Sequence, residues 1–428
     1  MNLITIISHD LGRYLGCYGV EGVRSPNIDA LAAESLTIDN AFCVAPQCSP
    51  SRAAMWTGRY PHANGVVGLC HGDFRNDLHK DEIHLAQILK QNGYTTWLHG
   101  DQHETREPAR LGFDHIDNPF FADPTADGFV QKMQSYDGKQ PFFAEICFFE
   151  PHRNFPKSED IKLLPEGTSP LPGYLPDLPV LREDFAAFEA SIATLDRAVG
   201  QIFDAVKQAG VWEDTIVIFT ADHGIPFPRA KMTLYDAGLE VPLIVRIPGG
   251  KSGERSPATF SNIDFTPSIL DLLGIPHPGG KSLHGVSRAD VLKGNDRQGR
   301  AEVYGEKTFH TYYDPMRCVR SCGWKLIANF ERAPAQETST DFHNNAHGYP
   351  ETALALGNTG YHPPFELYHL EADPHEENNL AEDPACAERL RELKQRLHQW
   401  MLQTEDPLLD GPIPSAAYRA RLADLKDE

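Results

Sequence analysis

The chain opens with Leu3-Ile4-Thr5-Ile6-Ile7, a run rich in β-branched residues that is followed closely by the polar pair His9-Asp10. An uninterrupted run of this kind is typical of a strand that is buried on both faces of a parallel sheet. Similar runs recur at residues 95–98, 141–149, 215–220 and 241–247. Helical patterns separate them, and this alternation of strands with helices predicts a doubly wound α/β sheet.

One helical pattern is long. Apolar residues recur at helical spacing from Phe185 to Val206, and Gly210 follows as a stop signal. The character of the chain changes after residue 300, where short strand-like runs occupy residues 303–305, 317–320, 324–330 and 365–370. A helix carrying Leu390, Leu393, Leu397 and Trp400 comes next. We therefore predict a large, mostly parallel sheet between helices over residues 1–305, and a small C-terminal antiparallel sheet with one helix over residues 306–428.

The composition limits the partners of this chain. It has 39 Lys and Arg against 60 Asp and Glu among 428 residues, which gives a formal net charge of −21. Such an acidic balance argues against a nucleic-acid or anionic-membrane partner. We find neither a run long enough to span a bilayer nor the pattern of a signal peptide, so we expect a cytoplasmic protein. The eight scattered cysteines indicate reduced thiols, because Cys318 and Cys322 lack a second pair of metal ligands nearby.

Four polar clusters each follow a predicted strand directly. They are His9-Asp10, the segment 101–104, the segment 150–153 and Asp222-His223-Gly224. In open α/β sheets, ligands bind beyond the carboxyl ends of the strands. One such cluster would mean little, since loops are polar anyway, but four that carry aspartate or histidine favour a shared site.

The segment Cys48-Ser49-Pro50-Ser51-Arg52 has a specific local geometry. Pro50 suits the first turn of a helix, and the helical character lasts to Thr57, before Gly58. Cys48 is thus expected at a helix N-terminus, where the dipole favours an anionic nucleophile and an anionic substrate. Arg52 is one turn further along and can reach back toward residue 48. The alternative is a buried structural thiol, which is the usual role of a lone cysteine.

The pattern Cys48-x-Pro50-x-Arg52 resembles the sulfatase signature that formylglycine-generating enzymes read. The neighbouring segments 25–32 and 57–62 also resemble sulfatases, as do 220–224, 231–235 with 241–244, and 366–380. This resemblance implies an alkaline-phosphatase-like fold with residues 1–305 as the catalytic domain. The heparan N-sulfatase (sulfamidase) branch is the most similar one, on the evidence of residues 222–229, 313–317 and 400–407.

The resemblance also implies roles for individual residues. Asp10, Asp222 and His223 look like ligands of one divalent cation beside Cys48, which would be oxidised to formylglycine. Calcium is expected first, with manganese or zinc as alternatives. Arg52 would hold the aldehyde hydrate, one hydroxyl of which attacks sulfur while the other lets the aldehyde re-form. The groups that would contact the sulfate and transfer protons are His103, His152 and Lys231.

Two positions depart from the sulfatase pattern. The family usually has two adjacent aspartates after the first strand, and here the first is His9, which either binds the metal or does not. Asp101 stands where the family usually has a lysine, and a carboxylate beside a sulfate is unfavourable. Either Asp101 points away, or the substrate differs, or Arg153 or Arg229 supplies the lost charge. Asp101 could also bind a cationic or hydroxyl-rich group of the substrate.

Three functions remain open at this point. The first is hydrolysis of a sulfate ester or sulfamate on a small anionic carbohydrate, with a formylglycine-generating enzyme as the maturation partner. The second is hydrolysis of a phosphonate monoester or phosphodiester, and the third is a binding protein that has kept the fold. The sequence leaves the sugar and the oligomeric state open, including a homo-oligomer. Glu104 is either a partner of His103 or a solvated carboxylate, and the histidines of the loop-rich C-terminal stretch are expected on the surface: His310, His343, His347 and His362.

Overall fold

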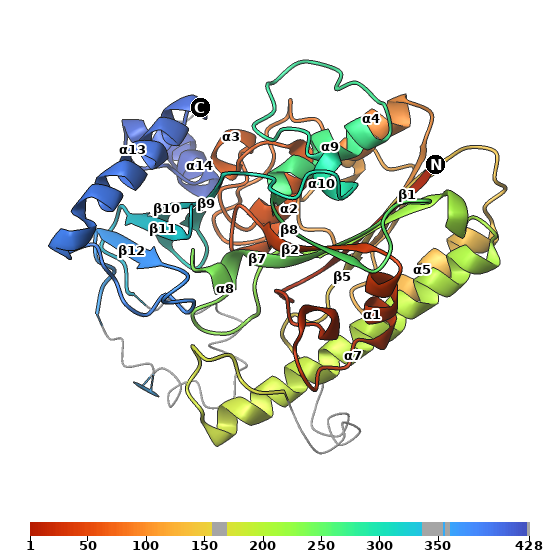
Figure 1. The fold of residues 1–428 in the computed structure, drawn as a ribbon. Coiled ribbons are helices and arrows are strands. Elements are labelled where there is room, and N and C mark those ends of the chain that lie inside the picture. The colour runs from red at the N-terminus through yellow and green to blue at the C-terminus, as the bar shows by residue number, and fades with distance from the viewer. Residues whose placement is uncertain (156–168, 336–353, 356–359, 426–428) are drawn as a thin grey trace.

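An eight-stranded sheet forms the centre of the computed structural model, which describes residues 1–155, 169–335, 354–355 and 360–425 (Figure 1). The strand order is β4-β3-β5-β1-β6-β7-β2-β8. The strands are β1 (Asn2–Ser8), β2 (Leu36–Phe42), β3 (Thr95–Gly100), β4 (His115–Asp117), β5 (Phe142–Phe148), β6 (Thr215–Ala221), β7 (Glu240–Arg246) and β8 (Glu254–Ser261). Neighbouring strands are parallel except that β7 runs antiparallel to both β6 and β2. The prediction of a large, mostly parallel sheet is therefore confirmed.

The sequence analysis missed three strands of this sheet, β2, β4 and β8. Strand β2 carries Asp39 and Asn40 in its middle, where its pairing with β7 shifts between Ile38 and Ala41. Strand β8 lies at the edge of the sheet and contains Pro257, which an edge tolerates because it needs no ladder hydrogen bond there. Strand β4 has three residues. A search for uninterrupted apolar runs does not find strands of these kinds.

Helices cover both faces of the sheet, with α1, α5 and α7 on one side and α2, α4, α9 and α10 on the other (Figure 1). The helices are α1 (Pro26–Ala33), α2 (Cys48–Thr57), α3 (Pro61–Asn64), α4 (Leu85–Gln91), α5 (Ala122–Gln134), α7 (Pro179–Gln208), α8 (Asp236–Leu239), α9 (Phe265–Leu272), α10 (Ala289–Leu292), α13 (Ala387–Gln403) and α14 (Ala416–Leu425). Short 3-10 turns are η1 (Gly16–Tyr18), η2 (Pro108–Leu111), η3 (Trp212–Asp214), η4 (Asn262–Asp264), η5 (Pro384–Cys386) and η6 (Pro407–Asp410). Helix α7 is the long predicted helix, and Gly210 follows it with a positive φ of 72°.

The C-terminal part forms a second, antiparallel sheet with the strand order β12-β11-β10-β9. Its strands are β9 (Glu302–Phe309), β10 (Tyr313–Ser321), β11 (Trp324–Asn329) and β12 (Phe365–His369). Helix α13 buries Leu393, Leu397 and Trp400 in the same apolar cluster as Val319 and Leu326 of the sheet. The small sheet with one helix is thus confirmed. Strand β9 runs through residue 305, and the division of the chain at that residue stays a prediction.

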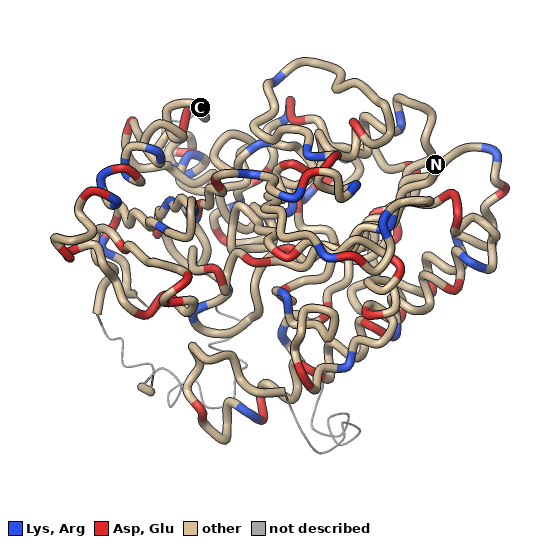
Figure 2. The backbone as a smooth tube through the Cα atoms, viewed as in Figure 1, with Lys and Arg blue, Asp and Glu red and all other residues tan. Residues whose placement is uncertain are grey.

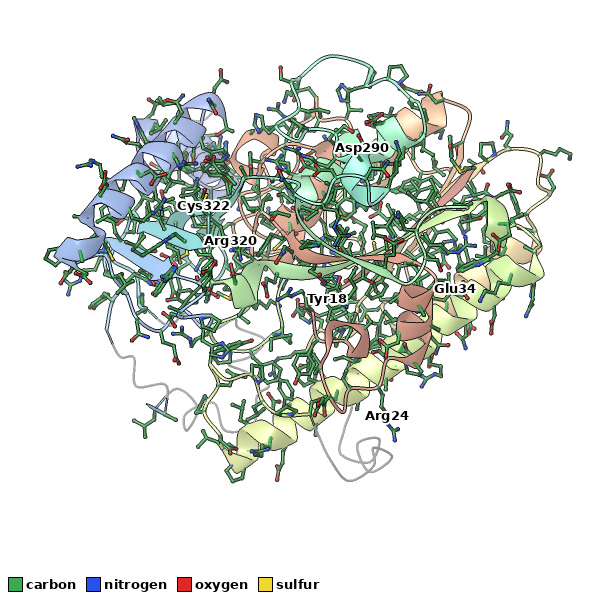
Figure 3. All side chains as sticks on the ribbon, viewed as in Figure 1. Tyr18, Arg24, Glu34, Asp290, Arg320 and Cys322 are labelled. Carbon is green, nitrogen blue, oxygen red and sulfur yellow. The ribbon has the colours of Figure 1, made fainter. Side chains whose placement is uncertain are left out.

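Acidic and basic positions are interspersed over the described chain rather than separated into large single-signed regions (Figure 2). Within these residues, no helix combines the length and the apolar content that crossing a bilayer requires. All eight cysteines are free thiols. Cys318 is buried in β10, whereas Cys322 is exposed just beyond the end of that strand (Figure 3).

A buried ionic cluster joins the small sheet to the main domain. Lys325 of β11 is fully buried, with its Nζ 2.5 Å from Asp236 Oδ1 of α8 and 2.9 Å from Glu376 Oε1. It also donates a hydrogen bond to the carbonyl of Leu234 at 3.0 Å. Removal of one partner from a buried charge pair leaves the other charge uncompensated, so this lysine is expected to be important for stability.

The variant Lys325→Met tests this cluster. We expect it to lower the free energy of unfolding by about 3–5 kcal/mol, because two buried carboxylates lose their cation. The control is Lys251→Met, which removes an exposed ion pair with Glu254 and should cost less than about 1 kcal/mol. Urea unfolding followed by circular dichroism measures both, and equal losses would show that the buried cluster contributes nothing special.

Candidate active site

Two neighbouring parallel strands bring their end residues together. Ser8 of β1 is in register with Ala221 of β6, so Asp10 and Asp222 follow side by side. The backbone N–H of Asp10 donates to Asp222 Oδ1 at 2.9 Å. Asp10 adopts a positive φ of 49°, a conformation that aspartate tolerates better than most residues. The sheet thus places two carboxylates at one point, and both are fully buried.

Cys48 lies against these carboxylates as the first residue of α2. Its Sγ is 3.8 Å from Asp10 Oδ1 and 3.3 Å from His223 Nε2. We call Asp10, Cys48, Asp222 and His223 the strand-end cluster. Burial raises the pKa of the Cys48 thiol well above its ordinary value; Lys231 opposes this shift, and Asp222 and Asp10 add to it. The unmodified thiol is therefore protonated at neutral pH and is a poor nucleophile.

The carboxylates of the strand-end cluster stay ionised although they are buried. Burial raises the pKa of Asp10, but Lys231, His152 and His223 outweigh it and bring the pKa well below its usual range. Burial likewise raises the pKa of Asp222, but His223, His9 and Arg52 outweigh this effect and bring the pKa well below its usual range. Lys231 Nζ is 2.7 Å from Asp10 Oδ2.

The donor atoms of this cluster fit a divalent cation. Atoms of His9, Asp10, Cys48 and Asp222 that could ligate a metal all lie within 4.8 Å of one another. The carbonyl of Gly224 lies 3.0 Å from His223 Nδ1 and can only accept, so that nitrogen carries the hydrogen. His223 Nε2 then points at Asp10 Oδ1, 3.0 Å away, where a metal could replace a proton. Carboxylate oxygens with one imidazole form a donor set for Ca²⁺, Mn²⁺ or Zn²⁺.

Arg52 pairs with Asp222 rather than with residue 48 directly. Its Nε donates to Asp222 Oδ2 at 3.1 Å from a fully buried position. Burial opposes the charged form, but Asp222 and its other acidic neighbours raise the pKa of Arg52 above its usual value. Neither Nη1 nor Nη2 of Arg52 has a hydrogen-bond partner among the described residues. Arg52 lies one turn along α2 from Cys48, and its two unsatisfied donors can serve an anionic group.

Lys231 and His152 form a polar pair beside the strand-end cluster. Lys231 Nζ lies 3.1 Å from His152 Nε2, and His152 Nε2 lies 3.7 Å from Asp10 Oδ2. His152 Nδ1 contacts the carbonyl of Arg153, which accepts only, so Nδ1 carries a hydrogen and Nε2 is the ring nitrogen that faces Lys231. The side chain of His152 is 16% exposed, which leaves it accessible from outside.

Asp101 points into the site, so the first explanation offered for it, that it points away, is wrong. Its Oδ2 lies 3.6 Å from His9 Nε2 and 3.4 Å from His103 Nε2. The two positions that depart from the sulfatase pattern, His9 and Asp101, therefore face each other. Burial lowers the pKa of His103 well below its usual value, so this imidazole is neutral. His71, which sequence analysis missed because it follows no strand, has its ring 5.3 Å from that of His103.

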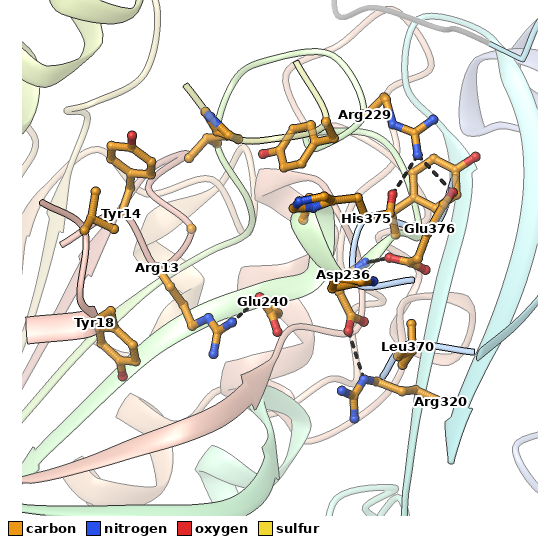
Figure 4. A pocket seen from close by; sticks show the side chains of 18 of the residues that line it. Arg13, Tyr14, Tyr18, Arg229, Asp236, Glu240, Arg320, Leu370, His375 and Glu376 are labelled. Carbon is orange, nitrogen blue, oxygen red and sulfur yellow. Dashed lines mark hydrogen bonds and ion pairs between the residues drawn. The ribbon is translucent and has the colours of Figure 1, made fainter. Parts of the chain in front are cut away.

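Asp101 replaces a lysine of the sulfatase pattern, and two arginines were expected to supply the lost positive charge. Both have partners within the protein. The guanidinium of Arg153 is buried and paired with both oxygens of Asp184 in α7, at 2.9 and 2.5 Å. Arg229 donates to the carbonyls of His375 and Glu376, at 2.9 and 3.0 Å (Figure 4). It lines a cavity of about 580 Å³, and none of the residues that line this cavity belongs to the strand-end cluster. Arg153 is thus buried and already paired, and the substrate-binding role of both arginines stays a prediction.

The structure describes two of the four histidines that were expected on the surface of the C-terminal stretch. His310 Nδ1 contacts the hydroxyl of Thr311, and His362 Nδ1 lies 3.4 Å from Glu366 Oε1. His343 and His347, with most of the long polar stretch at 331–364, lie outside the described residues.

Comparison with known proteins finds relatives among the sulfatases. The profile of the sulfatase family matches residues 1–275, and that of the N-sulphoglucosamine sulphohydrolase C-terminal region matches residues 227–347. The chain is 31% identical to human N-sulphoglucosamine sulphohydrolase, over 96% of this chain and 92% of that protein. It is 28% identical to an ulvan-active sulfatase of Formosa agariphila, over 96% and 82%. The solved structure of BT4656 with D-glucosamine-2-N,6-O-disulfate shares the fold, with a TM-score of 0.76 at 20% identity over 96% and 99% of the chains.

Behind the site, Glu104 is fully buried, so its interpretation as a solvated carboxylate is wrong. Neither of its carboxylate oxygens has a hydrogen-bond partner among the described residues, so no bond to His103 supports the other reading. Burial raises the pKa of Glu104 to about 7, against the attraction of Arg52. The folded state therefore holds a proton on Glu104 that the unfolded chain releases near pH 4.5.

This raised pKa predicts how stability depends on pH. The contribution of Glu104 is fully present below its unfolded pKa and is lost as the pH rises through about 7. Glu104→Gln mimics the protonated form, so it should gain stability relative to wild type between pH 5 and pH 8. Urea midpoints of metal-stripped protein at both pH values measure this gain. The control Glu107→Gln, at an exposed position in the same segment, should show no such trend; an equal gain there would contradict the assignment to Glu104.

Proposed function

This chain belongs to the sulfatase family, and from that premise we propose that it hydrolyses a sulfate ester or sulfamate of a sugar at the strand-end cluster. Hydrolysis of sulfuric esters is the reaction of the family. The sugar is inferred from the relatives, since one is named an N-sulphoglucosamine sulphohydrolase and a structural neighbour was solved with a sulfated glucosamine. We propose formylglycine, formed from Cys48 by a formylglycine-generating enzyme, as the nucleophile.

One observation carries this proposal: Cys48 lies beside two ionised carboxylates, and its thiol is protonated and therefore unreactive. Its Sγ lies 3.8 Å from Asp10 Oδ1, and burial keeps the sulfur protonated. A thiolate in this place would meet two negative charges. A neutral aldehyde hydrate meets no such repulsion and offers hydroxyl oxygens to a cation. The position of Cys48 therefore suits a modified residue better than a cysteine nucleophile.

A divalent cation would be held by Asp10, Asp222, His223 and the oxidised residue 48, with His9 close by. When bound, it would acidify a hydroxyl of residue 48 and polarise the sulfuryl group. We propose Ca²⁺ first, because the carboxylates supply oxygen ligands. The imidazole of His223 keeps Mn²⁺ and Zn²⁺ open.

Side chains of the site would hold the hydrate, protonate the leaving group and accept a proton. Arg52, one helical turn from residue 48, has two unsatisfied N–H₂ groups, and we assign them to hold the oxygens of the hydrate. Lys231 carries the proton in its contact with His152, and this pair is placed to protonate the leaving oxygen or nitrogen of the sugar. His103 is neutral because burial lowers its pKa, and neutrality is the state that a base requires.

A second candidate is hydrolysis of a phosphonate monoester or phosphodiester. It stays open because His9 and Asp101, which depart from the sulfatase pattern, both face the site. Kinetics with an aryl sulfate and an aryl phosphonate monoester, on the same preparation, separate the two. We expect the larger kcat/KM for the sulfate, and a larger value for the phosphonate would reverse the assignment.

The variant Cys48→Ser tests the nucleophile. Serine cannot form the aldehyde through the same maturation, so we expect kcat to fall by about 10³-fold or more. Peptide mass spectrometry of wild-type protein, co-produced with a formylglycine-generating enzyme, should show that residue 48 has lost sulfur and gained an aldehyde oxygen. Cys70→Ser is a matched control at another buried thiol and should keep the activity. Full activity of protein that retains the Cys48 thiol would contradict the proposal.

A further inference from the structure

Two histidine side chains beside the strand-end cluster approach one carboxylate oxygen of Asp101 without forming hydrogen bonds to it. His9 Nε2 and His103 Nε2 lie 3.6 and 3.4 Å from the same atom, Asp101 Oδ2. Among the described residues, His9 Nε2 and this oxygen of Asp101 have no hydrogen-bond partner. His9 is fully buried, so solvent does not satisfy it either. Buried polar atoms without partners are uncommon and call for a missing group.

The separations suit ligands that share a cation. With bond lengths of about 2.0–2.1 Å to nitrogen and oxygen, two ligand atoms of a tetrahedral metal lie roughly 3.3 Å apart. The distances of 3.4 and 3.6 Å are close to this value. The rings of His9 and His103 meet edge to face at 82°, with their centroids 5.0 Å apart. His9 and His103 also offer ligand atoms within 4.8 Å of one another in a group whose third member is Cys48.

The second nitrogen of His9 supports the same arrangement. His9 Nδ1 lies 3.1 Å from Asp222 Oδ2. A metal-bound imidazole usually turns its other nitrogen toward a carboxylate, which fixes the orientation of the ring. The ring of His9 therefore stands between Asp222 on one side and Asp101 on the other.

We propose that His9, Asp101 and His103 hold a second divalent cation, next to the one proposed for the strand-end cluster. Two imidazoles and one carboxylate suit Zn²⁺ or Mn²⁺ better than Ca²⁺. Three protein ligands leave a position for water or for an oxygen of the substrate. His103 is then a ligand, and its lone pair does not serve as a base while the cation is bound.

The second cation changes the charge that a substrate meets. A carboxylate alone at Asp101 repels a sulfate, whereas a divalent cation on one carboxylate and two neutral imidazoles gives a group with a net positive charge. This consequence rests on the proposed function, but the binding of the cation does not. It accounts for a sulfatase site in which Arg153 and Arg229 are both engaged elsewhere.

Titration of metal-stripped protein with Mn²⁺, followed by electron paramagnetic resonance, counts the bound ions. We expect two per chain in wild type, with a magnetically coupled spectrum, and one in Asp101→Asn and in His103→Gln. The matched control is His115→Ala, which disrupts another group of possible ligands, His99, His115 and Asp117, and should still bind two.

Three results would overturn the second site. One is a count of two in Asp101→Asn, and another is a count that falls in His115→Ala instead. The third is a wild-type count of one that stays at one in Asp101→Asn and falls to zero in Asp10→Asn; that outcome leaves the proposed function intact. Two ions in wild type that become one in Asp101→Asn and remain two in Asp10→Asn would support the second site and contradict the first.

Discussion

Two buried carboxylates of like charge, Asp10 and Asp222, are the constraint on which the rest of the structure depends. Their separation follows from the parallel register of β1 and β6, and neither can reach water. Such a pair is tolerable only if positive charge surrounds it. Arg52 and Lys231 are buried for this reason, since each takes one carboxylate as its partner at 3.1 and 2.7 Å. A cation among them extends the same compensation.

The small C-terminal sheet helps to hold Lys231 beside the two carboxylates. Two of its lysines donate to backbone carbonyls in the loop that carries Lys231: Lys307 to Met232 at 3.2 Å and Lys325 to Leu234 at 3.0 Å. The N–H of Met232 in turn donates to the carbonyl of Pro46, just before α2. The loop is thus fixed between the second sheet and the segment that leads to Cys48. A side chain that must meet Asp10 at hydrogen-bond distance needs such support, because errors of 1 Å are costly in a reacting site.

The sequence predicted the parts of this site that depend on local pattern. Buried apolar runs located β1, β3, β5 and β6, and the polar residues at their ends do meet. Pro50 and Gly58 located α2, which begins at Cys48. The pairing of Arg153 with Asp184 could not be predicted. The two residues are 31 positions apart in the chain, and their contact depends on how α7 packs against the segment that carries Arg153. The direction of Asp101 was equally open, since the strand end fixes its position but not the contacts of its side chain.

His9 and Asp101 show why separate substitutions can mislead. Considered one at a time against the sulfatase pattern, one residue loses a carboxylate and the other loses a cation, so each looks like damage to the site. In space they face each other at 3.6 Å, with His103 on the same oxygen. An acidic and a basic residue have exchanged places across one contact. What changes is the kind of group: an ammonium brings its own charge, whereas a carboxylate between imidazoles must obtain positive charge from outside the chain. This difference in the kind of group is the reason that we propose a second cation at Asp101.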